Sequence, residues 1–284
     1  ARKHKVPVLP IDVNYSDWDC TLEFQTGPTR QRGKETTANP SLAHRASVLR
    51  LGLRLIVGLR EDVAETIVRV REKDGPFASL ADFSNRTQLN RADQVRLAEA
   101  DAFGSLRTNR RQALWAAMAK DNKSRPLPLL DGLEEDETPV DLPATSEQEE
   151  VFADYRTAGL SLRGHPISFH REALQKLNIT TAACLPEIVN GKPVRVAGIV
   201  LLRQRPSTAK GITFVTLEDE TGTINLVVHQ RTWERFAAVT RHASAWLASG
   251  KLEAKDSVIH VGVSHLEDLA KRLATVKVKS RDFR

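Results

Sequence analysis

The spacing of apolar residues changes along this chain from a helical to an alternating period, and that change limits the folds available to it. Val63, Ile67 and Val70 recur at three- and four-residue intervals, as on one face of an α-helix. After Pro193, runs such as "VRVAGIVLLRQ" have the pattern of strands. Between these parts lies the aperiodic, acidic and proline-rich linker at 121–145, which is too polar to fold alone. The 284 residues therefore predict two or three domains.

The expected helical domain, residues 45–120, contains the stretch "LIVGLREDVAETI". It has the pattern of a helix-hairpin-helix turn, in which one helix ends at a glycine and the next begins two residues later. Gly58 occupies the first glycine position of that turn, and Arg60 replaces the second. Such a turn presents free backbone N–H groups to a phosphate. In place of the second glycine, Arg60 either hinders the close approach of the backbone or supplies a charged contact with the phosphate instead. By itself, the stretch fits an ordinary packing corner between two helices equally well.

A second helical pair at 79–103 favours the DNA-binding interpretation, because such hairpins often work in tandem. Ser79 and Asn90 have the side chains that cap helix N-termini. Thr108 or Asn109 is expected to begin a further helix in the same way.

The last part of the chain has the element order of an oligonucleotide-binding barrel. After a helical connector at 146–189, which a Ser146–Glu149 capping box begins, residues 190–268 show three strand-like runs, a helix and two more such runs. The ligand face of such a barrel centres on its second and third strands. Residues 269–284 remain as a C-terminal tail. The expected fold class is multidomain α+β, with a tandem helix-hairpin-helix domain followed by a five-stranded OB-fold β-barrel.

The loop "RQRPSTAKG" places Arg203, Arg205 and Lys210 between the first two strands of that barrel. These cations would line a groove for single strands. The loop is not a phosphate-binding P-loop, because the order GxxxxGK[ST] is absent. Phe214 follows on the next strand, where it either stacks on a base or belongs to the core, and the core is the commoner place for a strand phenylalanine.

Charge is distributed in blocks that point to polyanionic partners. Residues 1–120 carry 20 basic and 14 acidic side chains, 121–164 carry 4 and 11, and 165–284 carry 18 and 11. No apolar run is long enough for a membrane helix. Cys20 and Cys184 form no CxxC pair, so neither a zinc site nor a disulfide framework is indicated, and we expect a cytoplasmic protein.

A catalytic metal site is the weakest of the sequence-based interpretations. Asp17 and Asp19 in "SDWDC" suggest paired carboxylates for two metal ions, but no third acid accompanies them on a strand pattern. His165 and His170 likewise lack a third ligand. The interpretation of these residues as ordinary surface or loop positions is favoured.

The order of several motifs resembles a known protein family. These motifs are "VPVLPIDVNYSDWDCTLE", "LRLGLRLIVGLRED", "GPFASLADF", "EADAFGSLRTNRRQALW", "DYRTAGLSLRGHP", "RQRPSTAKGITFVTLEDETGTINLVV" and "SRDF". Together they are similar to the C-terminal third of bacterial family C DNA polymerases, specifically the error-prone type used in damage-induced mutagenesis. The resemblance extends over nearly the whole chain.

The resemblance implies that residues 1–44 are the end of the polymerase fingers and that the catalytic aspartates lie upstream. The parent enzyme would add dNMP units to a primer across damaged template with Mg²⁺ held elsewhere, so no cofactor is expected in this chain. The helical domain would bind double-stranded DNA, and the barrel would lie near single-stranded template. The alternative is a stand-alone nucleic-acid-binding or adaptor protein with the same two modules.

The resemblance also bears on how the protein is recruited to the sliding clamp. Replicative relatives carry a short motif between the helical domain and the barrel that begins with Gln, ends in an apolar pair including Phe, and docks on the sliding clamp. Here the matching stretch "RPLPLLDGLEEDE" has Arg125 for the Gln and only Leu127, Leu129 and Leu130 as apolar residues. Direct clamp binding is therefore expected to be weak or absent, with an accessory mutagenesis protein as the partner. A purely solvated tether fits the composition equally well.

Overall fold

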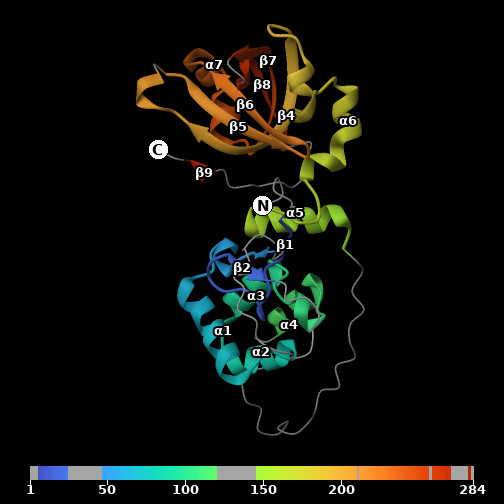
Figure 1. Ribbon diagram of the computed structural model, residues 1–284, viewed down its shortest axis with the longest axis vertical. Helices are drawn as coiled ribbons and strands as arrows, with labels where there is room; N and C mark the ends of the chain where they lie inside the picture. The colour runs from blue at the N-terminus through green and yellow to red at the C-terminus, as the bar shows by residue number, and fades with distance from the viewer. Residues whose placement is uncertain are drawn as a thin grey trace, which may run out of the picture. The chain divides into compact units, whose positions relative to one another are not determined.

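The two kinds of apolar spacing correspond to two separately folded units in the computed structural model of the chain, Ala1–Thr145 and Ser146–Arg284 (Figure 1). The structure describes residues 6–24, 47–119, 145–209, 211–255, 258–269 and 281–282. None of the helices in these ranges is both long and apolar enough to span a lipid bilayer.

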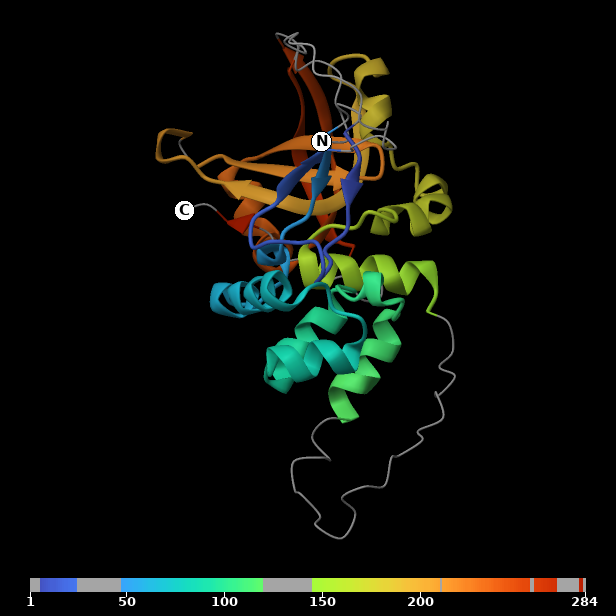
Figure 2. The same cartoon turned by 60° about the horizontal axis from the view of Figure 1, so that its bottom comes forward.

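In its described residues, the first unit combines a small three-stranded sheet with four α-helices. Its elements are β1 (Val8–Leu9), β2 (Thr21–Phe24), β3 (Ser47–Arg50), α1 (Glu61–Asp74), α2 (Leu80–Thr87), α3 (Arg91–Glu99), α4 (Arg110–Ala119) and the 3-10 helices η3 (Leu53–Leu55) and η4 (Gly104–Leu106). β3 lies in the middle of the sheet, parallel to β1 and antiparallel to β2. Figure 2 shows these strands on one side of the helices. The sheet thus joins residues from both sides of the boundary expected at residue 45.

Capping side chains begin the helices where the sequence predicted them. The Ser79 hydroxyl accepts a hydrogen bond from the N–H of Asp82, and the Asn90 side chain accepts one from the N–H of Asp93. Asn109, rather than Thr108, accepts from the N–H of Gln112 at 2.9 Å at the start of α4. Each cap satisfies a backbone donor that the first helical turn leaves without a partner.

The hydrophobic core of the first unit lies between the short helices. Phe83 of α2 is almost fully buried and packs edge-to-face on Phe77 and Phe103, with ring centroids 4.9 Å and 5.1 Å away. Leu53, Ile67 and Leu97 bring η3, α1 and α3 into the same interior, and each is fully buried. This packing explains why such short helices are stable, since helices of this length are marginal on their own.

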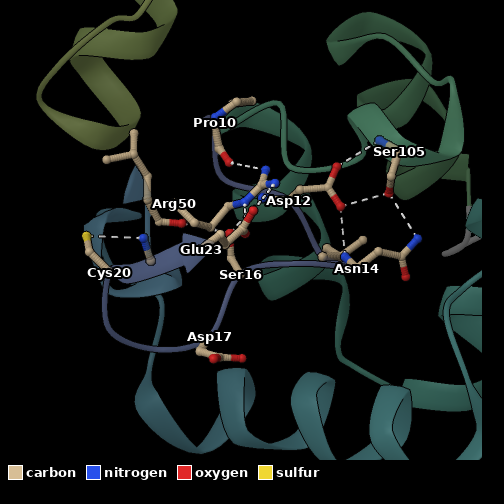
Figure 3. Close-up of polar contacts among 12 residues, drawn as sticks. Pro10, Asp12, Asn14, Ser16, Asp17, Cys20, Glu23, Arg50 and Ser105 are labelled. Carbon is tan, nitrogen blue, oxygen red and sulfur yellow. Dashed lines mark hydrogen bonds and ion pairs between the residues drawn. The ribbon is translucent and has the colours of Figure 1, made fainter. Parts of the chain in front are cut away.

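A polar network attaches the N-terminal segment to the helices (Figure 3). The buried Asp12 carboxylate accepts hydrogen bonds from the backbone N–H and the hydroxyl of Ser105, both at 2.7 Å, and from the N–H of Asn14 at 2.8 Å. The Asn14 amide in turn exchanges two hydrogen bonds with the backbone of Phe77. Arg50 of β3 joins the Pro10 carbonyl to the Glu23 carboxylate.

The second unit begins with the connector helices α5 and α6 and continues into a β-barrel. Its elements are α5 (Glu147–Ala158), α6 (Arg171–Lys176), β4 (Pro193–Gln204), β5 (Thr213–Asp219), β6 (Gly222–Val228), α7 (Gln230–Arg235), α8 (Ala237–His242), β7 (Ala245–Lys255), β8 (Val258–Asp268) and β9 (Arg281–Asp282). The predicted capping box is present, because Ser146 and Glu149 bond reciprocally at the start of α5.

The barrel has the topology that the sequence predicted. Its strands follow the order β5-β6-β8-β7-β4 and close through pairing of β4 with β5, with β6 and β8 parallel. The predicted helix between the third and fourth strands is two short helices, α7 and α8, which meet at Phe236. Trp246 is fully buried in the barrel core, and Trp233 packs against it with ring centroids 6.2 Å apart.

The connector forms part of the barrel unit rather than a free tether. Val151, Ile167 and Leu174 from the connector share one buried cluster with Ile199 of β4 and Leu247 of β7. Burial of these side chains holds residues 146–189 against the outside of the barrel.

Candidate nucleic-acid interface

The hairpin turn of the first unit runs from η3 into α1. Ile56 and Leu59 are buried, whereas Val57, Gly58 and Arg60 are exposed, so the apex of the turn faces solvent while two apolar side chains anchor it. Gly58 has φ +80°, a conformation that glycine adopts at little cost. The first helix of this hairpin is only the single 3-10 turn η3. The positive φ of Gly58 therefore explains why a glycine occupies this position. The pattern of residues alone did not give that reason.

The N-terminus of α1 follows directly after this apex. Arg60 is the N-cap residue, its backbone is extended, and its side chain makes no capping hydrogen bond. Its guanidinium instead lies 3.1 Å from the Asp62 carboxylate, and both side chains are about two-thirds exposed, at 67% and 66%. An ion pair this exposed contributes little to stability, so exchanging it for a phosphate contact is energetically inexpensive.

Arg96 is a neighbour of this turn that no sequence pattern singled out. A Cβ atom placed on Gly58 would lie 3.2 Å from Nε of Arg96, which belongs to α3. Arg96 donates to the buried Asp93 carboxylate at 2.7 Å, and its side chain is 38% exposed. The second hairpin, α2 and α3, therefore places a cation beside the apex of the first.

The acids at Asp17 and Asp19 are each paired with an arginine. Asp17 accepts from Arg71 at 2.7 Å, and Asp19 pairs with Arg54. No cluster of three or more potential metal ligands occurs in the described part of the chain. Carboxylates already paired with arginines are a poor fit for Mg²⁺.

The outer face of β5 and β6 is the region where an OB-fold binds its ligand. Phe214 points outward on β5 with 43% of its surface exposed, so it is not a core residue. Val227 of β6 lies opposite it, and Thr216 lies opposite Asn225 further along the pair. This face thus offers one aromatic ring beside Val227, Thr216 and Asn225, with the acidic Glu218 further along β5, and the ring is placed to stack on a base.

The three predicted loop cations have different environments. Arg205 is exposed after the end of β4. Arg203 turns inward, where its Nη2 donates to the carbonyl of Ala243 at 2.5 Å and its guanidinium lies 5.4 Å from the ring centre of Trp246. Lys210 lies outside the described residues. Of the two described cations, Arg205 is the one placed to meet a ligand.

The acidic turn at the opposite end of the β5–β6 hairpin holds the connector. The buried Asp219 carboxylate accepts from the N–H groups of Ala182, Thr221 and Gly222. Arg171 of α6 binds Glu220 with two nitrogens, Nε and Nη2. Burial raises the pKa of the Glu220 carboxyl, but hydrogen bonds and charge, chiefly from Arg171, outweigh it and hold that pKa below its ordinary value. This end of the hairpin is therefore a structural clasp.

Comparison with known families and proteins agrees with both units. Residues 5–113 match the family described as helix-hairpin-helix motif, and residues 194–269 match the family described as OB-fold nucleic acid binding domain. A solved structure, the asparaginyl-tRNA synthetase from Pyrococcus horikoshii, is 25% identical over 31% of this chain and 22% of its own, with a TM-score of 0.28, too low to support an inference.

Three similar proteins named error-prone DNA polymerase come from Rhodopirellula baltica, Methylococcus capsulatus and Anaeromyxobacter sp. strain K. They are 45%, 41% and 42% identical over 100% of this chain. The chain covers 24%, 27% and 24% of their respective lengths, about a quarter in each case. Over its whole length the chain is therefore similar to a segment of proteins named error-prone DNA polymerase, and in this chain a helix-hairpin-helix domain precedes an OB-fold domain.

Proposed function

We propose that this chain is the DNA-holding segment of an error-prone DNA polymerase, in which the first unit binds duplex and the barrel binds single-stranded template. The observation that carries the proposal is the exposed turn at Gly58, which stands directly before the uncapped N-terminus of α1. Similarity to such polymerases over the whole chain supports it.

Contact with phosphate suits a polymerase, because the product duplex must be held whatever its sequence. Backbone N–H groups at the start of α1 and the guanidinium of Arg60 bind phosphate oxygens without reading bases. Arg96 adds positive charge at the same apex. On the barrel, Phe214 stacks on a base and Arg205 attracts the backbone, a combination that binds single strands with little sequence preference.

For the whole protein, the proposed activity is template-directed addition of dNMP to a primer during damage-induced, translesion synthesis. We assign the reaction and its Mg²⁺ ions to the remainder of the polymerase, since the acids of "SDWDC" are paired with arginines. We propose that an accessory mutagenesis protein brings the polymerase to DNA. The apolar stretch considered for clamp binding, with Arg125, Leu127, Leu129 and Leu130, lies outside the described residues.

The proposal that the first unit binds duplex DNA is tested by the substitutions Gly58→Val and Arg60→Ala in the full chain. The valine crowds the apex against a phosphate and against Arg96, whose Nε lies 3.2 Å from the added Cβ, so duplex affinity should fall by about tenfold or more, equivalent to about 1.4 kcal/mol. Arg60→Ala should lower the slope of log affinity against log salt by about one unit. Fluorescence anisotropy with a labelled duplex at several salt concentrations measures both quantities.

Two matched controls separate DNA contact from fold stability. Gly75 has φ +83° at the other end of α1 with open space around it, so Gly75→Val reproduces the backbone strain away from the apex. Arg69→Ala removes an exposed cation from the same helix. The proposal fails if the apex variants, correctly folded, bind duplex with the affinity and salt slope of these controls.

A further inference from the structure

The β5–β6 hairpin carries its charge at one end. The residues that form it, 213–228, include three acids and neither Lys nor Arg. Phe214 lies at the open end of the hairpin, paired with Val227, whereas the acids lie at the turn. One of them, Glu218, is partly exposed on the same outer face as Phe214. Because like charges repel, a DNA strand stacked on Phe214 is not expected to continue toward the turn.

The helix α7 begins directly after the open end of the hairpin. β6 ends at Val228, His229 is the N-cap residue, and α7 starts at Gln230. The loop that joins β4 to β5 reaches the same place, because a Cβ atom placed on Gly211 would lie 3.2 Å from Cβ of Gln230. Phe214, the β4–β5 loop and α7 therefore lie together at one end of the barrel.

Two arginines of α7 point away from the barrel. Trp233 of this helix packs against the barrel core. Arg231 and Arg235 lie four residues apart on the side of the helix opposite Trp233, and both are exposed. Residues at this spacing are about 6 Å apart along a helix, so the two guanidinium groups can bind neighbouring phosphates of one strand.

Both arginines are available for such a contact. In the part of the chain that the structure describes, neither Arg231 nor Arg235 forms an ion pair. The acid of α7, Glu234, accepts a hydrogen bond from the side chain of Gln230 at 2.8 Å. The guanidinium of Arg235 lies 5.3 Å from the ring centre of Phe236, a contact that leaves its hydrogen-bond donors for a phosphate.

Charge therefore changes sign between the two ends of the β5–β6 face. Residues 229–242, which include α7 and α8, carry one acidic side chain and three basic ones, Arg231, Arg235 and Arg241. We propose that a single strand bound on the barrel stacks a base on Phe214 and then leaves over α7, where Arg231 and Arg235 bind its phosphates. This inference deepens the single-strand binding proposed for the barrel and rests on it. It assigns the strand a path that leads away from the acidic turn.

The double substitution Arg231→Gln and Arg235→Gln in the full chain is the first test. Affinity for a labelled oligothymidylate should fall by about tenfold in low salt, and the slope of log affinity against log salt should fall by about 1.4, which is about 0.7 for each lost phosphate contact. Glutamine has nearly the helix propensity of arginine, so the variant should retain the melting temperature of the parent chain.

The matched control removes two exposed cations elsewhere in the same unit. Arg156 of α5 and Lys176 of α6 belong to the connector, which is attached at the turn end of the hairpin through Arg171 and Glu220. The double substitution Arg156→Gln and Lys176→Gln changes the net charge by the same amount. It should leave the affinity and the salt slope near those of the parent chain, because the proposed path does not reach the connector.

Chemical protection gives a second readout that needs no substitution. Phenylglyoxal modifies exposed guanidinium groups, and mass spectrometry locates the modified arginines. A saturating oligothymidylate should slow modification of Arg231 and Arg235 and leave Arg156 unchanged.

The outcomes distinguish this inference from the function on which it rests. If neither Phe214→Ala nor the arginine double variant weakens binding of the oligothymidylate, the barrel takes no part and its proposed function is wrong. If Phe214→Ala weakens binding while the arginine double variant behaves like its control, the strand takes another path and only this inference is overturned. Equal modification of Arg231 and Arg235 with and without the oligothymidylate overturns it as well.

Discussion

Phe214 is the single side chain on which stacking by the barrel depends. It is the large aromatic residue exposed on the β5–β6 face, and Val227 of β6 lies opposite it. Stacking of a base on an aromatic ring contributes about 1–3 kcal/mol, so Phe214→Ala should weaken single-strand binding by about fivefold to a hundredfold or more. Titration of labelled single-stranded DNA measures the change.

Phe214→Tyr is the matched control, because it preserves the ring and should retain near-native affinity. Equal affinity of the alanine and tyrosine variants would show that the ring takes no part in binding. Arg203 is a poor choice for the same experiment, since its contacts to Ala243 and Trp246 make it a structural residue as well as a cation. Arg205→Ala is the cleaner test of charge in the loop.

At the scale of elements, the clasp between α6 and the β5–β6 turn should make the stability of the second unit depend on pH. The folded-state pKa of Glu220 lies below its ordinary value of 4.5. The ion pair with Arg171 therefore stabilises the fold fully at pH values above 4.5, and this contribution is lost as the pH falls through the lower folded-state pKa. Arg171→Gln should lower the melting temperature at pH 7 and flatten its acid dependence below about pH 4.5.

His170 provides an internal reference for that measurement. Burial lowers the pKa of His170 below its ordinary value of 6.5, so stability also falls as the pH drops below 6.5 and the unfolded chain takes up the proton first. Arg171→Gln should leave this higher step in place. Thermal unfolding from about pH 3 to 8 resolves the two windows. If Arg171→Gln removed both pH-dependent losses of stability, or neither of them, the assignment of the acid step to Glu220 would be wrong.

At the scale of the whole molecule, the segment 121–145 bears on how the polymerase is recruited to DNA. The apolar residues Leu127, Leu129 and Leu130 lack the aromatic anchor and the leading glutamine of a clamp-binding motif. Loss of such anchors costs several kcal/mol, enough to move a micromolar contact toward the millimolar range. We expect a labelled peptide of residues 121–137 to bind purified sliding clamp with a Kd no tighter than the high micromolar range.

The acidic run Glu134–Glu137 strengthens that expectation if the clamp surface is acidic, because like charges repel across an interface. Micromolar binding that disappears in the Leu129→Ala and Leu130→Ala peptide would show direct docking on the clamp. In that case an accessory partner would not be needed for delivery to DNA.

Local patterns in the sequence were sufficient for the element order. The caps at Ser79, Asn90 and Ser146 and the strand that begins at Pro193 depend on neighbouring residues, and the structure confirms them. The OB-fold order and the helix-hairpin-helix domain were predictable for the same reason, because periodicity reports which face of each element is buried. Whether Gly58, Arg60, Arg205 and Phe214 contact DNA stays a prediction.

Only the tertiary structure decided which side chains share a site, because residues distant in sequence carry no local signal of their contact. Arg203 and Arg205 look alike in "RQRPS", yet one is drawn inward by Ala243 and Trp246, about forty residues away, and the other remains exposed. The sequence by itself determined the order of helices and strands and the blocks of charge. The proximity of Arg96 to Gly58 and of β9 to β4 depended on packing of the folded chain.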